Sequence, residues 1–183
     1  MYHTIENVLE YSRVSDLDST MEIVDLNKVI EKVSFNLQNK INNKNAIIDS
    51  HALPISWANE NQMTSLFQNL IENSLKYNKS EKAIIHIIVE SKNDYHLISF
   101  SDNGIGIDIK YENQIFEIFK RLHNQTQYEG SGVGLAICKR IVENHKGSIW
   151  LDKSDKKGST FKIKLPILNE EKILFESSSN IHA

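Results

Sequence analysis

The chain has 183 residues, of which 40% are hydrophobic and 25% charged, the balance expected of one soluble globular domain with short appendages. A formal net charge of −3 gives no reason to expect nucleic acid or an anionic membrane as a partner, and the longest apolar run, residues 83–89, is too short to span a bilayer. The single cysteine, Cys138, excludes an internal disulfide and fits a reducing compartment, so we expect a cytoplasmic location.

The N-terminal half of the chain predicts helices separated by short strands. Residues 2–12 approximate helical spacing but need a partner to bury their apolar stripe, and a polar linker at 15–22 follows. The next segments, in chain order, are a strand at 23–26, a helix capped by Asp25 or Asn27 that runs through Leu37, a strand at 46–49, a loop at 53–57 and a helix at 59–77.

The C-terminal half predicts mostly antiparallel strands. In chain order we expect an antiparallel pair at 83–92 and 95–102, a short helix around 111–120, a polar stretch at 121–132, a helix at 132–144 and a hairpin at 147–166. This pattern favours an α+β fold, a two-layer sandwich with a mixed, mostly antiparallel sheet and about three helices on one face. We expect domain limits of 1–20 for a helix remnant and linker, 21–168 for the globular domain and 169–183 for a polar tail.

The helix at 59–77 carries an unusual polar stripe. Asn69, Asn73 and Lys76 fall on one side at helical spacing, with Tyr77 at the edge, although asparagine is a mediocre helix former. A solvated helix face is one interpretation. The other is a ligand rich in oxygen, because the Asn73 amide could bind Mg²⁺ and Lys76 could meet a phosphate.

Two glycine-rich segments add to this stripe. In SDNGIGI, residues 101–107, the glycines allow close approach of a flat or anionic group, and Asp102 could accept a hydrogen bond from an amine such as that of adenine; a simple turn is the alternative. GSGVGLAI, residues 130–137, opens a helix whose free N–H groups could meet phosphates. It matches neither the Walker loop nor the dinucleotide fingerprint.

Together and in this order, the segments strongly resemble the catalytic and ATP-binding domain of bacterial sensor histidine kinases, of the gyrase and histidine-kinase ATPase superfamily. QNLIENSLKY at 68–77 resembles the asparagine box of that family, DNGIGI its first glycine box, IFEIFKRLH at 115–123 its phenylalanine box and GSGVGLAI its second glycine box. The resemblance covers residues 23–166, and YSRV at 11–14 resembles the end of the family's second dimerisation helix.

The resemblance implies an ATP and Mg²⁺ site with assigned roles. Asn73 would bind Mg²⁺, Asn69 would help to position the phosphates and Lys76 would contact phosphate. Tyr77 would lie against the base or ribose, and Asp102 would bind the adenine amine. The further nucleotide-binding residues it implies are Gly104, Gly106, Ile107, Phe119, Arg121, Gly130, Ser131, Gly132, Val133, Gly134 and Leu135. Phe116 and Phe119 would anchor a movable lid at 121–131, from which Arg121 would reach the γ-phosphate.

Catalytic roles are expected for Asn69, Glu72 and Arg121. Hydrolysing members of the superfamily carry a glutamate base four residues before the metal-binding asparagine, where this chain has Asn69, so transfer to a partner is favoured over hydrolysis. Glu72 points to another side of the helix and is expected at most to orient a water or the Mg²⁺ shell.

The resemblance implies transfer of the ATP γ-phosphoryl group to a histidine on a dimerisation domain absent from this chain, for relay to a response-regulator receiver domain. His3 lacks the acidic residue that the family places after its acceptor, so the fragment is expected not to phosphorylate itself and to be a monomer cut from a homodimeric parent. We expect no direct membrane contact from this chain. Alternatives are a Ser/Thr kinase of the anti-sigma-factor type and a non-catalytic nucleotide-binding module.

Overall fold

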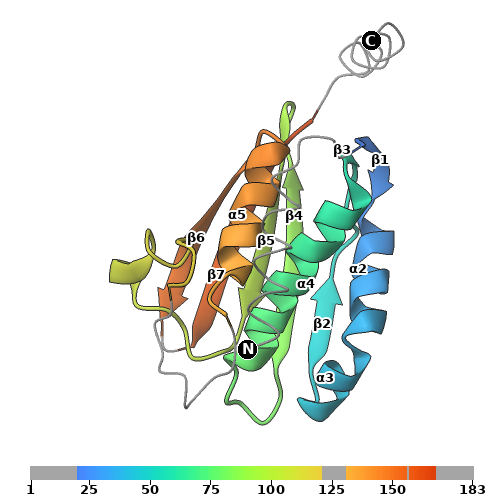
Figure 1. The fold of residues 1–183 in the computed structure, drawn as a ribbon. Helices are drawn as coiled ribbons and strands as arrows, with labels where there is room; N and C mark the ends of the chain where they lie inside the picture. Colours follow the sequence, from blue (N-terminus) through green and yellow to red (C-terminus); the bar gives the residue numbers. More distant parts are fainter. Residues whose placement is uncertain (1–19, 121–130, 156, 168–183) are drawn as a thin grey trace, which may run out of the picture.

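The structure of the protein, a computed structural model, is one main sheet covered by helices on one face (Figure 1). It describes residues 20–120, 131–155 and 157–167. The main sheet has five strands in the order β2-β4-β5-β7-β6. In chain order they are β2 (Ile47–Ser50), β4 (Ile84–Ser91), β5 (Tyr95–Asp102), β6 (Ser148–Asp155) and β7 (Gly158–Pro166). β2 pairs with β4 in parallel and the other pairs are antiparallel, so the predicted mixed, mostly antiparallel sheet is confirmed.

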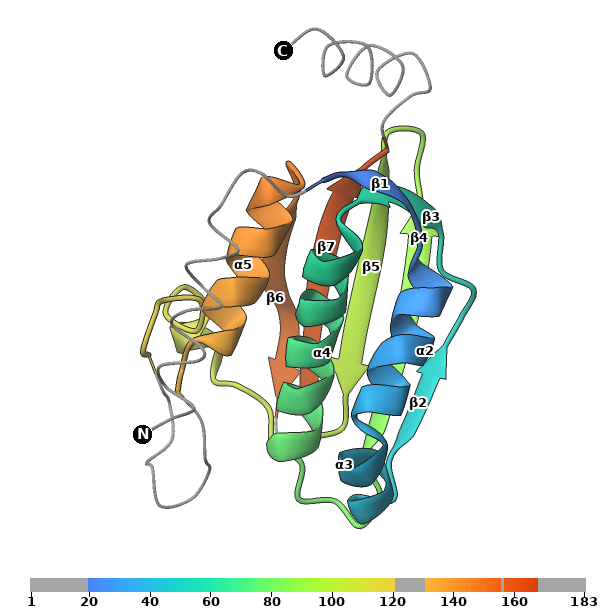
Figure 2. The ribbon, with the colours of Figure 1, turned by 45° about the vertical axis from the view of Figure 1, so that its right-hand side comes forward.

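Three helices form the second layer and lie side by side across the sheet (Figure 2). They are α2 (Leu26–Asn36), α4 (Glu60–Lys76) and α5 (Gly134–Asn144), and the short α3 (Gln38–Asn43) follows α2. α4 is the central helix, because it packs against α2 on one side and α5 on the other. The helix with the asparagine stripe therefore lies beside the helix that the second glycine box opens.

The core lies between the two layers because the strands alternate. On β4, Ile85 and Ile87 are fully buried beneath the helices, whereas His86 between them is exposed on the far face. On β5 the ring of Phe100 meets the ring of Phe67 from α4 edge to face, with 5.1 Å between the ring centroids. These contacts hold α4 at a defined height above the sheet.

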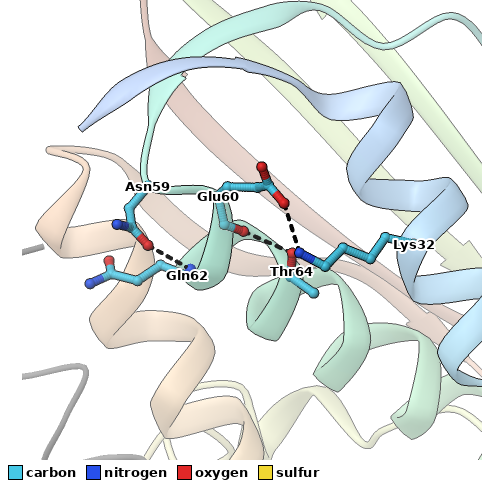
Figure 3. A network of polar contacts seen from close by, with 5 residues as sticks. All are labelled: Lys32, Asn59, Glu60, Gln62 and Thr64. Atoms are coloured by element: carbon cyan, nitrogen blue, oxygen red, sulfur yellow. Dashed lines mark hydrogen bonds and ion pairs between the residues drawn. The ribbon is translucent and has the colours of Figure 1, made fainter. Parts of the chain in front are cut away.

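The start of α4 is set by polar contacts at its first turn (Figure 3). The Asn59 side chain caps the helix by accepting a hydrogen bond from the Gln62 N–H at 2.9 Å. Glu60 forms an ion pair with Lys32 of α2 at 2.7 Å, and the Thr64 hydroxyl donates to the Glu60 carbonyl. The cap therefore fixes where the helix begins, and the ion pair joins its first turn to α2.

A second, two-stranded ribbon covers one end of the core. β1 (Glu22–Asp25) pairs with β3 (Ile55–Ala58) in antiparallel register, and Asp25 caps α2 by accepting from the Asn27 N–H at 2.9 Å. The strand at 23–26 and the cap are thus confirmed, but the loop expected at 53–57 is wrong. The second strand forms because Ser56 and Ala58 turn inward onto the core while β1 supplies its hydrogen-bond partners, and no local signal reveals that pairing.

The helix expected around 111–120 is also wrong. The segment contains a 3₁₀ helix, Ile109–Tyr111, followed by turns, and Phe119 has a positive φ of 64°. The Phe119 N–H donates to the Gly132 carbonyl at 3.0 Å instead of continuing a helix. Tertiary contacts of Ile115, which is buried, and Phe116, which packs on Phe161 of β7, override the helical spacing of the sequence.

Within the described ranges, no helix has the length and apolar character needed to cross a bilayer. Several expectations concern residues outside those ranges: the helix at 2–12, most of the linker at 15–22, the lid residues 121–130 and the tail at 169–183.

Candidate functional site

Three segments far apart in the sequence meet at one end of the sandwich: the C-terminal half of α4, the loop after β5 and the N-terminus of α5. The contact between the helices is close. A Cβ atom placed on Gly134, the first residue of α5, would lie 2.7 Å from the Asn69 Oδ1 atom of α4. Asn69 is held there because its Nδ2 donates to the Ser65 carbonyl at 2.9 Å. A larger residue at 134 would therefore force the Asn69 side chain to shift.

The rest of the stripe lies along the same part of α4. Asn73 is half-buried, and its amide makes no hydrogen bond to another residue that the structure describes. The Lys76 ammonium lies 4.5 Å from the centroid of the Tyr77 ring, a cation–π contact at the end of the helix. Thus Asn69, Asn73, Lys76 and Tyr77 are brought together as the sequence predicts.

Asp102 ends β5 inside this region. Its Oδ1 accepts hydrogen bonds from the Gly104 N–H at 2.7 Å and the Ser159 N–H at 3.4 Å. Burial raises the pKa of this carboxyl, against the opposing effect of those two backbone donors and of the Ser74 hydroxyl. Both backbone donors meet the same oxygen, so the second carboxylate oxygen is left without a backbone partner. A buried carboxylate oxygen without a backbone donor has acceptor capacity for a neutral N–H donor.

The first glycine box packs against the turn between β6 and β7. Gly106 has φ of 74°, and a Cβ atom there would overlap the Asp155 carbonyl oxygen. Gly158 has φ of 134°, and its Cβ would overlap the Asp102 carbonyl oxygen. The Ile107 N–H donates to the Ser154 hydroxyl at 2.5 Å. The turn between β6 and β7 therefore packs directly against the end of β5 and the loop that follows Asp102.

The sequence did not predict that Gly158 and Ser159 would contact Asp102. Their only signal was a glycine opening the last strand directly after a polar turn, which is typical of any hairpin. These contacts depend on the register of β5 and β7. Because Ser101 pairs with Thr160, the turn before β7 lies next to the end of β5.

The phenylalanine box and the second glycine box are joined. The Phe119 N–H reaches the Gly132 carbonyl, and Gly132 has φ of 73°. Val133 is fully buried, and its carbonyl accepts the first helical hydrogen bond of α5 from Ile137 at 2.9 Å. Ser131 and Leu135 are half-buried on either side of Val133. The predicted residues 131–135 thus lie at the start of α5, where Gly134 is close to Asn69.

Other predicted residues are not brought to this site or are not described. The Glu72 carboxylate accepts from the Lys40 Nζ atom of α3 at 2.8 Å, so it faces away from α5, on the side of α4 where α2 and α3 lie. Arg121, Gly130 and His123 lie outside the described ranges. Cys138 is buried in the core on α5, where its thiol faces the Leu66 carbonyl at 3.8 Å, as expected for a packing residue.

The described residues fit a nucleotide better than a metal ion alone. Within the described ranges, no group of three or more His, Cys, Asp or Glu side chains could hold a metal. An ion bound through the Asn73 amide oxygen would need phosphate and water oxygens for its remaining ligands, as Mg²⁺ commonly does. The glycines at 104 and 134 let the backbone pass close to the Asp102 and Asn69 side chains, which a Cβ atom there would meet.

Comparison with known proteins places these features in one family. Residues 58–169 match the profile described as histidine kinase-, DNA gyrase B- and HSP90-like ATPase. Cyanobacterial phytochrome A of Nostoc sp. is 40% identical over 172 residues, 94% of this chain and 22% of the relative. The adaptive-response sensory kinase SasA of Synechocystis sp. is 30% identical over 174 residues, 91% of this chain and 45% of the relative. The chain therefore spans less than half the length of both relatives.

Solved structures share the fold at lower identity. Full-length ShkA in complex with AMPPNP has a TM-score of 0.76 and 21% identity, covering 89% of this chain and 35% of that one. Histidine kinase ThkA in complex with the response regulator TrrA has a TM-score of 0.72 and 21% identity, covering 90% of this chain and 46% of that one. At this identity the likeness establishes the fold alone, and it confirms the predicted two-layer architecture.

Proposed function

Because the chain belongs to the histidine kinase-, DNA gyrase B- and HSP90-like ATPase family, we propose that it is the ATP-binding catalytic domain of a sensor histidine kinase. The observation that carries this proposal is the meeting of the asparagine stripe, the Asp102 loop and the start of α5, with Asn69 in contact with Gly134. Similarity to the sensory kinase SasA supports the kinase assignment over the alternatives.

The adenine end of the site is assigned to the first glycine box. Asp102 would accept the exocyclic amine of adenine on the oxygen that has no backbone donor, while Gly104 holds the other oxygen. Gly106 and Ile107 continue the loop after Asp102. Tyr77, the C-cap residue of α4, would lie against the base or ribose. A carboxylate that is buried and fixed by backbone donors selects adenine over bases that lack an amine at this position.

The phosphate end is assigned to the two helices. Lys76 would leave the Tyr77 ring to meet phosphate oxygens, and Asn69 would position the phosphates. The first N–H groups of α5, at residues 134–136, have no carbonyl partner within the helix and favour negative charge. Arg121, from the lid segment, is proposed as a further contact to the γ-phosphate.

Asn73 is the proposed protein ligand of Mg²⁺, because its half-buried amide has no hydrogen bond among the described residues. The ion, when bound, would neutralise phosphate charge. Asn69 cannot act as a base, and Glu72 is engaged with Lys40, so this chain offers positioning and charge neutralisation rather than activation of water. These properties support transfer to a partner over rapid hydrolysis.

The proposed acceptor is a histidine on a dimerisation domain, from which the phosphoryl group passes to a response-regulator receiver domain. The structure of ThkA with TrrA supports this class of partner for a protein of the same fold. We propose that the chain acts in the cytoplasm as the catalytic part of a longer homodimeric kinase.

The first test is calorimetric titration of a non-hydrolysable ATP analogue into the chain, with and without Mg²⁺. Binding should depend on Mg²⁺ and weaken in Asn73→Ala. The matched control is Asn61→Ala, an exposed asparagine on the same helix outside the stripe, which should leave the dissociation constant unchanged. A folded chain that binds no adenine nucleotide would refute the proposal.

The second test separates the kinase classes. The chain is incubated with labelled ATP and a separately produced histidine-containing dimerisation domain. Label that survives alkali but not acid supports a histidine kinase. Label stable to acid on a protein hydroxyl would support the anti-sigma-factor type, and binding without transfer would support a non-catalytic module.

A further inference from the structure

A pair of asparagines outside the predicted site ties the first glycine box to the end of α4. Asn78 follows Tyr77, and Asn103 lies between Asp102 and Gly104. The Asn78 Nδ2 donates to the Asn103 Oδ1 at 2.6 Å. We call these two residues the asparagine bracket. Asn78 is 2% exposed, which is exceptional for an asparagine in a connecting loop.

The side chains of the bracket make three further hydrogen bonds, to residues 80–84 between the end of α4 and the start of β4. The Asn103 Oδ1 also accepts from the Ile84 N–H at 2.8 Å, and its Nδ2 donates to the Lys82 carbonyl at 3.0 Å. The Asn78 Oδ1 accepts from the Ser80 N–H at 2.8 Å. Residues 78–84 are therefore folded around one side chain of the first glycine box.

A second tie runs beside the bracket. The Ile105 N–H donates to the Tyr77 carbonyl at 3.0 Å, and a Cβ atom on Gly104 would lie 2.8 Å from that same carbonyl oxygen. The loop that carries Asp102 is thus pressed onto the last residue of the asparagine stripe. Neither tie involves an atom that the proposed nucleotide contacts.

We propose that Asn103 is a positioning residue that sets the spacing between the adenine contact at Asp102 and the phosphate contacts at Asn73 and Lys76. This inference rests on the proposed function. Asn103 is next in the chain to the first contact, and through Asn78 it holds the end of the helix that carries the other two. A ligand that contacts both the adenine end and the phosphate end binds more tightly when the spacing of the two ends is fixed before binding. The hydrogen bonds of the bracket fix this spacing, so less conformational entropy is lost when the ligand binds.

The test compares a ligand that reaches both ends with one that reaches a single end. The dissociation constants of a Mg²⁺-loaded ATP analogue and of adenosine are measured for the unaltered chain and for Asn103→Ala, with adenosine followed by NMR chemical-shift titration. The ATP analogue should bind Asn103→Ala about tenfold more weakly, whereas adenosine should lose threefold or less. A role in folding alone would weaken both ligands by the same factor.

Asn27→Ala is the matched control. Asn27 makes the same kinds of bond at the opposite end of the sandwich, where its Nδ2 donates to the Leu53 carbonyl and its Oδ1 accepts from the Leu53 N–H, both at 2.8 Å. Its loss should lower the melting temperature but leave the ratio of the two dissociation constants within twofold. Asn78→Ala should reproduce the shift of Asn103→Ala, and the double variant should lose no more than the larger single loss, since both remove one interaction.

The outcomes are distinct. An unaltered, folded chain that binds neither ligand overturns the proposed function and this inference with it. Binding by the unaltered chain with an unchanged ratio in Asn103→Ala overturns the inference alone and leaves the proposed function standing.

Discussion

Replacing Asp102 by asparagine should stabilise the fold and impair nucleotide binding at the same time. The change keeps the size of the side chain and the Oδ1 acceptor for the Gly104 and Ser159 N–H groups. It removes a negative charge that burial disfavours, as the raised pKa of this carboxyl indicates. It also replaces the second oxygen, which we assign to the adenine amine, with a donor.

The sign of the stability effect follows from proton linkage. A carboxyl whose pKa is raised in the native state binds more protons when folded than when unfolded, at pH values between 3.8 and the raised value. The contribution of Asp102 to stability therefore falls as pH rises through that window and is unfavourable at neutral pH. Asp102→Asn should be more stable than the unaltered chain at pH 7, and the difference should vanish in acid.

The binding effect has the opposite sign. A hydrogen bond to a charged group contributes about 1.5–3 kcal/mol, so its loss should weaken binding of the ATP analogue by about 10- to 150-fold. The unaltered chain should also lose affinity as pH falls through the raised pKa of Asp102, whereas the variant should show no such dependence.

Urea denaturation between pH 4 and 8 measures the first effect, and calorimetric titration over the same range measures the second. Asp108→Asn is the control for the loss of one carboxylate, because Asp108 is exposed and pairs with Lys110 beside the same loop. A variant that is less stable than the unaltered chain at pH 7, or that binds the analogue with unchanged affinity, would refute the reasoning.

Three further predictions concern the helices. Gly134→Ala should destabilise the fold by about 1–3 kcal/mol by overpacking against the Asn69 amide, and adding Asn69→Ala should recover most of that loss in thermal melts. His145 is buried, burial lowers its pKa, and its Nε2 accepts from the Asn59 N–H at 3.0 Å, so its contribution to stability is complete above pH 6.5 and is lost as pH falls below it. His145→Gln should therefore flatten the dependence of the unfolding free energy on pH in that range, measured by urea denaturation. An unchanged dependence would show that the histidine is protonated in the fold. Glu72→Gln, which removes an exposed ion pair to α3, should change the unfolding free energy by less than about 1 kcal/mol and the transfer rate by less than twofold, and a tenfold slower transfer would instead assign Glu72 to the reaction.

Local patterns predicted the elements whose signals are contained within one segment. The apolar spacing of α4 and its Asn59 cap lie within a few residues of each other, and the alternation on β4 and β5 is complete within each strand. Patterns failed where a distant segment provides the hydrogen bonds. β3 exists because β1 pairs with it, and the turns at 112–120 form because Phe119 bonds to Gly132 across the chain.

The sequence by itself determined which chemical groups are available and in what order: amides on a helix, a carboxylate before glycines, and glycines before a second helix. Side-chain chemistry and helical phase are local properties, so they can be read without the fold. Only the tertiary structure decided that Glu72 faces Lys40, that both backbone donors meet one oxygen of Asp102, and that Asn78 and Asn103 join two connections. Each of these contacts links residues from different segments, and their distances depend on how the helices and strands pack.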